Sequence, residues 1–292
     1  MTSQVSRLRS LSRTVLAALL CATLTACTSV GDQGRGDRRV VVVSPPDPDA
    51  PRHTHETTIG DGTSAEAGGY RMAALSFSET TDQPGVLSFR ILGPAGRPVL
   101  DFTEEQTKLL HLYVVRDDLA VFRHLHPSMQ EDGTWSAYVD VGEPGRYRVV
   151  AEFVPTGRPG GSHVVVAGRV TLSGASADLG GEPTPYDDLV MVEGPATVPV
   201  GEDEELSLVV SDGAGGSLNL GTYLGAYAHL TGFEETTGAF VHVHPLGAPT
   251  PAEGGSELRF HTSFAEAGRY RFFVQVRVDG FVHTVPLTLA VG

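Results

Sequence analysis

The chain has 292 residues, of which 40% are hydrophobic, and a formal net charge of −14 at pH 7. This length is enough for two domains of ordinary size. The negative charge disfavours binding to nucleic acid and to anionic lipid headgroups, and it favours binding of cations.

The first 26 residues have the features of a secretory signal. Arg7, Arg9 and Arg13 form a basic start, and the apolar run over residues 15–24 is too short to span a bilayer. We therefore expect residues 1–26 to be a targeting segment that takes no part in the fold.

The apolar run ends in Leu24-Thr25-Ala26-Cys27, which resembles the bacterial lipobox. That resemblance implies that Cys27 receives diacylglycerol and becomes the new N-terminus. Two or three acyl chains anchor a protein stably where one is marginal. We expect a lipoprotein held at the cell membrane and facing its extracytoplasmic side. The alternative is an ordinary signal peptide that is cut after Ala26.

Removal of residues 1–26 would take away three arginines and no acids, which changes the formal charge from −14 to −17. Of the two cysteines, Cys21 would leave with the signal and Cys27 would be lipidated. No disulfide would then be available, so stability must come from hydrophobic cores or from bound ligands.

Residues 27–69 are rich in Gly, Pro, Asp, Ser and Thr and hold little apolar sequence. Such a segment buries too little apolar surface to offset the entropy of ordering it. We expect it to be a flexible tether between Cys27 and the folded part of the chain.

The rest of the chain contains an internal repeat. The two copies of its central motif read Leu110-His111-Leu112 with His124-Leu125-His126-Pro127, and Ala228-His229-Leu230 with His242-Val243-His244-Pro245. The first two histidines are 13 residues apart in both copies. We therefore expect two copies of one domain, at residues 70–177 and 186–292.

Each copy has short apolar runs separated by Gly, Pro, Asp and Asn, a pattern typical of a β-sandwich. In the first copy we expect strands over residues 70–78, 86–92, 109–115, 120–126, 134–141, 146–154 and 163–172. Seven strands suit an immunoglobulin-like topology. Gly145-Arg146-Tyr147 and Gly268-Arg269-Tyr270 resemble the tyrosine corner of such domains. The sequence thus predicts an all-β fold of two tandem sandwiches.

The histidines are expected to gather on one face of a hairpin. If the strands carrying His111 and His124 turn around a centre between Asp117 and Asp118, through two or four residues, His111 faces His124. His126 then lies on the same face, because side chains alternate along a strand. Alternation does not decide whether this face points into the sandwich.

The second copy supports the same construction. A hairpin centred between Glu235 and Thr236 places His229 opposite His242, with His244 on the same face. Each domain would then present three imidazoles, which is a first shell suited to Cu(II) or Zn(II). The alternative is that the histidines are polar structural residues of the two sheets.

At these residues the chain resembles a family of exported bacterial proteins whose tandem sandwich repeats carry an HLHP or HVHP hairpin, some of them described as heavy-metal-binding. It is similar, more distantly, to the cupredoxin-like copper-resistance domains of the CopC and YtkA type. The ligands that the resemblance implies are His111, His124 and His126, and in the second copy His229, His242 and His244. The lipobox cysteine replaces the N-terminal histidine of CopC-type sites, and no Met-rich loop is present.

Two functions are compatible with these features. The first is a non-enzymatic, membrane-anchored protein that binds copper or zinc and buffers the ion or passes it to a transporter. The second is a structural or interaction module of the envelope, in which the sandwiches contact another envelope protein and the histidines only pack. We expect no enzymatic activity, since the sequence contains neither GxSxG nor HExxH.

Overall fold

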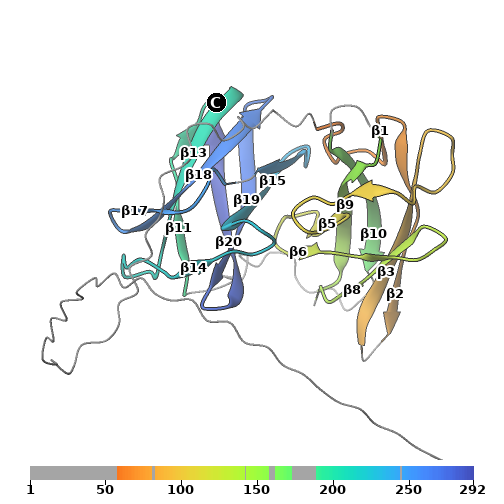
Figure 1. The fold of residues 1–292 in the computed structure, drawn as a ribbon, viewed down its shortest axis with the longest axis horizontal. Coiled ribbons are helices and arrows are strands. Elements are labelled where there is room, and N and C mark those ends of the chain that lie inside the picture. Colours follow the sequence, from red (N-terminus) through yellow and green to blue (C-terminus); the bar gives the residue numbers. More distant parts are fainter. Residues whose placement is uncertain (1–57, 81–82, 142, 158–161, 173–188, 244) are drawn as a thin grey trace, which may run out of the picture. The chain divides into compact units, whose positions relative to one another are not determined.

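A computed structural model describes residues 58–80, 83–141, 143–157, 162–172, 189–243 and 245–292. Within these ranges the chain is all β, as the sequence predicts, and it forms two repeated sandwich-like units (Figure 1). No helix there is long and apolar enough to cross a membrane. The predicted signal, Cys27 and most of the predicted tether lie outside the described residues.

The first repeat contains all seven predicted strands and three short additional ones. Their bounds are β1 Glu66–Ala67, β2 Tyr70–Thr80, β3 Gln83–Leu92, β4 Phe102–Thr103, β5 His111–Arg116, β6 Phe122–Leu125, β7 Ser128–Met129, β8 Thr134–Val139, β9 Gly145–Pro155 and β10 Val164–Leu172. One sheet has the order β1-β2-β3-β8-β7, and the other has the order β10-β9-β5-β6, with β4 beside β9. This division of strands is that of an immunoglobulin-like sandwich.

The second repeat follows the same plan. Its strands are β11 Met191–Glu193, β12 Thr197–Val198, β13 Gly201–Ser211, β14 Leu220–Gly221, β15 Ala228–Glu234, β16 Phe240–Val243, β17 Thr250–Ala252, β18 Gly255–Phe264, β19 Gly268–Val278 and β20 Phe281–Val291. Its sheets have the orders β11-β13-β18-β17 and β12-β20-β19-β15-β16. Strands β15, β16 and β19 therefore correspond to β5, β6 and β9.

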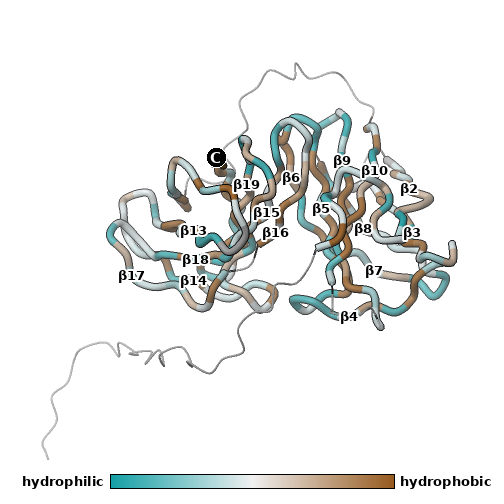
Figure 2. Tube along the Cα trace, turned by 90° about the horizontal axis from the view of Figure 1, so that it is seen from above, coloured by the Kyte–Doolittle hydropathy of each residue, from teal (hydrophilic) through white to brown (hydrophobic). Residues whose placement is uncertain are grey.

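Each sandwich closes around its own apolar core. In the first repeat, the side chains of Leu87, Trp135 and Val149 are at most 1% exposed and belong to one cluster. In the second repeat, Leu208 and Phe272 occupy a corresponding cluster. Brown, hydrophobic stretches gather around β5 and β8 in Figure 2. Period-two alternation in the sequence produces these inward faces.

A tyrosine corner is present in both repeats. The hydroxyl of Tyr147 donates to the carbonyl of Glu143 at 2.7 Å, and the hydroxyl of Tyr270 donates to the carbonyl of Glu266 at 3.0 Å. Each bond spans four residues at the start of a long strand, β9 or β19. The predicted resemblance to the corner of immunoglobulin-like domains is confirmed.

Strand β5 is buried on both of its faces. Leu112 and Val114 belong to the core of the first sandwich, whereas Tyr113 and Val115 belong to a third cluster. This third cluster also contains Phe233, Phe240 and Phe273 of the second repeat. The face that carries His111 therefore points toward the second repeat and away from the core of its own sandwich.

Aromatic stacking joins the two repeats across this cluster. The rings of Phe122 and Phe273 lie parallel, with 4.2 Å between centroids and 4° between planes. Phe122 is 3% exposed and Phe273 is fully buried. Two rings that bury this much area stabilise the contact by more than area alone, by about 0.5–1.5 kcal/mol.

Residues 58–69, at the end of the predicted tether, are hydrogen-bonded to the folded repeats. The N–H of Ile59 donates to the carbonyl of His163 at 2.8 Å, and the N–H of Val165 donates to the carbonyl of Ile59 at 2.9 Å. The carbonyl of Asp61 accepts from Phe240 of the second repeat at 2.7 Å. Gly60, between Ile59 and Asp61 in the sequence, adopts a φ of +87°. A Cβ at this position would collide with the carbonyl of Val165, so only glycine fits here.

Candidate metal centre

The hairpin of β5 and β6 sets which residues face each other. The N–H of Arg116 donates to the carbonyl of Val121 at 2.9 Å, so a four-residue loop over 117–120 connects the strands. Asp118 shapes this loop by accepting the N–H of Ala120 at 3.0 Å, and Leu119 adopts a φ of +60°. The centre of the hairpin therefore lies one residue later than predicted.

The predicted pairing of His111 with His124 is wrong by two residues. Tyr113 lies opposite His124, and the register carried one pair further places His126 opposite His111. Because side chains alternate with a period of two, a shift of two residues leaves the three histidines on one face. The predicted gathering of His111, His124 and His126 is confirmed.

The three imidazoles lie in contact distance of one another. One ring nitrogen from each residue can be chosen so that all three lie within 4.8 Å of one another. Ring centroids are 5.3 Å apart for His111 and His124, 5.1 Å for His111 and His126, and 4.8 Å for His124 and His126. His111 is buried, and the other two rings are partly buried.

A tight turn before β5 fixes the tautomer of His111. Its Nε2 lies 3.1 Å from the carbonyl of Glu105 and must donate to it, because a carbonyl only accepts. Glu105 and Lys108 exchange two backbone hydrogen bonds, with Gln106 and Thr107 both at positive φ between them. The turn thus holds the Nε2–H of His111 and leaves Nδ1 as its acceptor nitrogen.

A residue of the second repeat fixes the tautomer of His124. Its Nδ1 lies 2.7 Å from Oε1 of Gln275, while Nε2 of Gln275 donates to Oγ1 of Thr284 at 3.2 Å. Since Oε1 accepts, Nδ1 of His124 carries the proton and Nε2 is the acceptor nitrogen. That nitrogen lies 3.0 Å from Nδ1 of His111, so in the neutral forms of both rings two acceptors face each other.

Burial and neighbouring imidazoles oppose protonation of this cluster. Burial, followed by the effects of His126 and His111, holds the pKa of His124 well below its usual value. Burial, then His111 and Lys108, lowers the pKa of His126 to about 3. Nε2 of His126 is itself buried without a hydrogen-bond partner among the described residues. Burial therefore disfavours the protonated forms of His124 and His126, and one ring nitrogen from each of the three residues lies in one small region.

The second histidine set is described only in part. His229 is fully buried, and its Nε2–H donates to the carbonyl of Tyr223 at 2.8 Å. Thr231, and not His229, lies opposite His242, so the predicted pairing is again wrong by two residues. The loop closes with Glu234 N–H on the carbonyl of Ala239 at 2.9 Å, one residue later than predicted. The side chain of His242 and all of His244 lie outside the described residues.

Two further side chains contact the trio, Gln275 and Tyr113, and the sequence assigned neither of them a role in the site. Tyr113 stacks on His124 with 4.5 Å between centroids, and its hydroxyl donates to Oε2 of Glu152 at 3.1 Å. Oε1 of Glu152 lies 3.2 Å from Nδ1 of His163. Burial, then Glu152, raises the pKa of Tyr113 well above its usual value. The alternation that placed the histidines also places Tyr113 beside them, whereas no sequence signal identifies Gln275.

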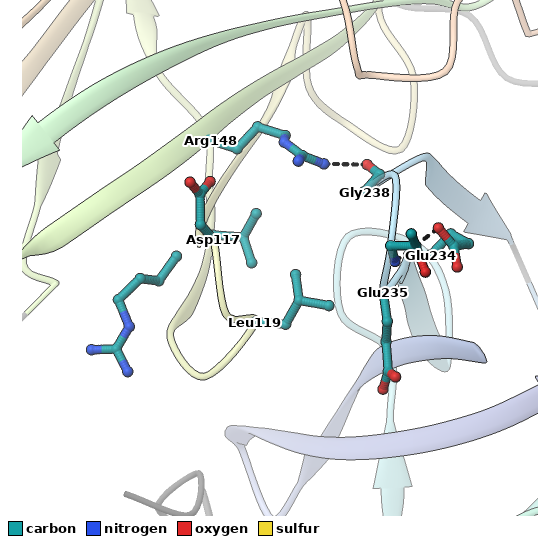
Figure 3. Close-up of a pocket in the computed structure, with 9 residues that line it drawn as sticks. Asp117, Leu119, Arg148, Glu234, Glu235 and Gly238 are labelled. Carbon is teal, nitrogen blue, oxygen red and sulfur yellow. Dashed lines mark hydrogen bonds between the residues drawn. The ribbon is translucent and has the colours of Figure 1, made fainter. Parts of the chain in front are cut away.

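A separate small cavity of about 50 Å³ lies beside Arg148 (Figure 3). One guanidinium nitrogen of Arg148 donates to the carbonyl of Gly238, and Glu234 and Asp117 also line the space. Burial, then Arg169, lowers the pKa of Arg148. A cavity of this size holds only a few water molecules. It is therefore too small for an organic substrate, and the histidine trio is the stronger candidate site.

Comparison with known proteins gives a family but no activity. A family model described as "Domain of unknown function (DUF8832)" matches residues 64–168 and again residues 185–292. No curated protein matches the chain. Among solved structures, the Yersinia pseudotuberculosis adhesin InvE matches at 11% identity and a TM-score of 0.21, over 76% of this chain and 58% of the adhesin.

A second solved structure, MtrC from Shewanella baltica OS185, matches at 6% identity and a TM-score of 0.23. That match covers 76% of this chain and 68% of the other. The match to the adhesin covers 58% of that protein, so the chain spans less than two thirds of the adhesin's length. At these scores neither likeness says anything about function.

Proposed function

The chain belongs to the DUF8832 family, and we propose that it binds one divalent transition-metal ion, copper or zinc, at His111, His124 and His126. The observation that carries the proposal is the convergence of acceptor nitrogens. Each of the first two rings has its N–H engaged by an oxygen outside the trio, so its lone pair points inward. Lone pairs that face each other at 3.0 Å repel unless a proton or a metal ion lies between or beside them, and the pair is therefore arranged to take up such a cation.

The spacing of these nitrogens suits a metal ion. Metal–nitrogen bonds to histidine are about 2.0–2.1 Å, so two ligands of a tetrahedral site lie about 3.3 Å apart. The 3.0 Å between Nδ1 of His111 and Nε2 of His124 is close to this value. The three ligand nitrogens lie within 4.8 Å of one another, against about 3.3 Å in a tetrahedral site. The nitrogen of His126 would therefore need to move by about 1.5 Å to bind the same ion.

The donor set favours copper or zinc over harder ions. Imidazole is a borderline ligand suited to zinc and copper, whereas magnesium and calcium require oxygen ligands. The outer contacts to the carbonyl of Glu105 and to Gln275 hold two rings in the orientation needed, which is the usual arrangement around metal-bound histidine. The negative charge of the chain favours approach of a cation.

The place of action proposed here rests on the N-terminal sequence. A lipid on Cys27 would hold the repeats at the outer side of the cell membrane, where the protein would buffer the ion or deliver it to an envelope transporter. Radiolabelled palmitate incorporation into the wild-type chain and not into a Cys27→Ser variant would support the anchor. Equal labelling of the two would refute it.

Calorimetric titration of the metal-free full chain with Zn²⁺ and Cu²⁺ tests the proposed binding. We expect one ion per first-repeat site, bound more tightly than by a free peptide with the sequence of residues 124–127. His111→Gln and His126→Gln should each weaken binding by at least the 10–100-fold that loss of an outer contact costs. His261→Gln is the matched control, because His261 lies on β18, outside the trio.

Two results would overturn the proposal. One is wild-type binding no tighter than that of the free peptide, and the other is unchanged binding in both trio variants. Either result would leave the interaction module as the remaining function. A partner recovered from native membranes with the metal-free protein would then identify it.

A further inference from the structure

The second repeat contributes directly to the histidine cluster of the first. His229 and Gln275 lie directly opposite each other on β15 and β19, and both side chains reach the trio. Gln275 accepts the Nδ1–H of His124 at 2.7 Å. The ring of His229 lies 5.9 Å from that of His124, centroid to centroid. The cluster is therefore built from both repeats.

His229 is prepared as a nitrogen ligand in the same way as His111. In both repeats the Nε2–H of the histidine donates to the carbonyl of the residue six positions earlier, Glu105 for His111 and Tyr223 for His229. In both repeats that carbonyl begins a tight turn closed by two backbone hydrogen bonds. The tautomer of His229 is thereby fixed, with Nδ1 as the acceptor nitrogen.

An ion bound by the trio would have three protein ligands, one fewer than a four-coordinate site needs. Zinc in stable protein sites is almost always four-coordinate, and the first repeat supplies three nitrogens. His229 is fully buried, and its ring is only slightly farther from His124 than the trio rings are from one another, 5.9 Å against 4.8–5.3 Å. A shift of about 1 Å toward His124 would give these two rings the spacing that the trio rings have among themselves, at which a zinc ion binds four ligands.

We propose that the ion is shared between the repeats, with His229 as its fourth nitrogen ligand and Gln275 as the residue that positions His124. This inference rests on the proposed function, because it concerns the same ion. Its consequence is that binding of the ion fastens the second repeat to the first. The Phe122 and Phe273 stack already holds the two surfaces at this place, so the ligands are brought together before the ion arrives.

The test counts the imidazoles around Cu²⁺ in the full chain. One equivalent of Cu²⁺ is added, and pulsed electron paramagnetic resonance measures the number of coupled imidazole nitrogens, with calorimetry on the same samples. We expect four imidazoles in the wild-type protein and three in His229→Gln. Gln275→Leu should weaken binding by about 10–100-fold with the imidazole count unchanged. Gln275→Glu, which still accepts from His124, should restore binding.

His261→Gln again serves as the control and should behave as wild type. Three imidazoles around Cu²⁺ in the wild-type protein would overturn the shared ion while the trio site stands. This count needs no variant, so it holds even if His229→Gln fails to fold. An unchanged affinity in Gln275→Leu would overturn the role of Gln275. Absence of bound Cu²⁺ in the wild-type protein would overturn the proposed function itself.

Discussion

Acidification from pH 7 to pH 5 should lower the free energy of unfolding of the metal-free protein. The His126→Gln variant should lose less of this free energy over the same pH range. Burial, then His111 and Lys108, lowers the pKa of His126 from 6.5 to about 3, so the folded ring stays neutral over this range. The unfolded chain binds a proton at this residue below pH 6.5. The stability that the neutral ring contributes is therefore fully present above pH 6.5 and is lost as the pH falls toward 3.

The size of the effect follows from the unfolded state. Moving 1.5 pH units below a pKa of 6.5 corresponds to about 2 kcal/mol, at 1.36 kcal/mol per unit. His126 is only partly buried, so solvent screening reduces this to about 1 kcal/mol. For a chain of this size, a change of 1 kcal/mol shifts Tm by roughly 2–4 °C. Between pH 7 and pH 5 the wild-type Tm should thus fall about 2–4 °C further than that of His126→Gln.

The assay is thermal unfolding followed by circular dichroism, with a chelator present so that no metal contributes. Wild type, His126→Gln and the control Tyr138→Gln are compared at pH 7 and pH 5. Tyr138 is 77% exposed on β8, so its substitution should leave the pH dependence of wild type. Equal losses of Tm in wild type and His126→Gln would refute a neutral, buried His126 in the folded state.

Five further substitutions probe the interface and the fold. Phe122→Ala should lower the free energy of unfolding by about 3–5 kcal/mol. In a double-mutant cycle, urea unfolding should show coupling to Phe273→Ala of about 0.5–1.5 kcal/mol, and additive effects would contradict the observed stack. Tyr147→Phe and Tyr270→Phe should each cost about 1 kcal/mol, because each removes one hydroxyl-to-carbonyl bond; a change in only one repeat would contradict equivalent corners. Gly238→Ala should lower Tm by several degrees, because a Cβ there meets the guanidinium of Arg148 at a φ of +72°; a Tm equal to that of wild type would argue against this contact.

The strands and the shared face of the histidines could be predicted from the sequence. Alternation of apolar residues gave all seven main strands of the first repeat, and it placed His111, His124 and His126 on one side of the hairpin. The register could not be predicted, because it depends on where the turn closes. Asp118 and Leu119 move that point by one residue, through a side-chain hydrogen bond and a left-handed backbone that spacing does not reveal.

The direction of the histidine face could not be predicted either. Strand β5 is apolar on both sides, because one side packs into its own sandwich and the other packs against the second repeat. Alternation assumes that one face is buried and the other is solvated. Gln275 is 151 residues from His124 in the sequence, and only tertiary packing brings the two together. A reading of each repeat by itself therefore finds three ligands and misses the contribution of the other repeat.

The attachment of residues 58–62 has a mechanical consequence. A pulling force applied from the N-terminal side of this segment meets the bonds of Ile59 with His163 and Val165 in one repeat and then the bond of Asp61 with Phe240 in the other. Both sandwiches would thus bear the force, at the place where this segment is bonded to each of them. A protein pulled from that end would first lose these hydrogen bonds, while the two sandwiches stayed intact.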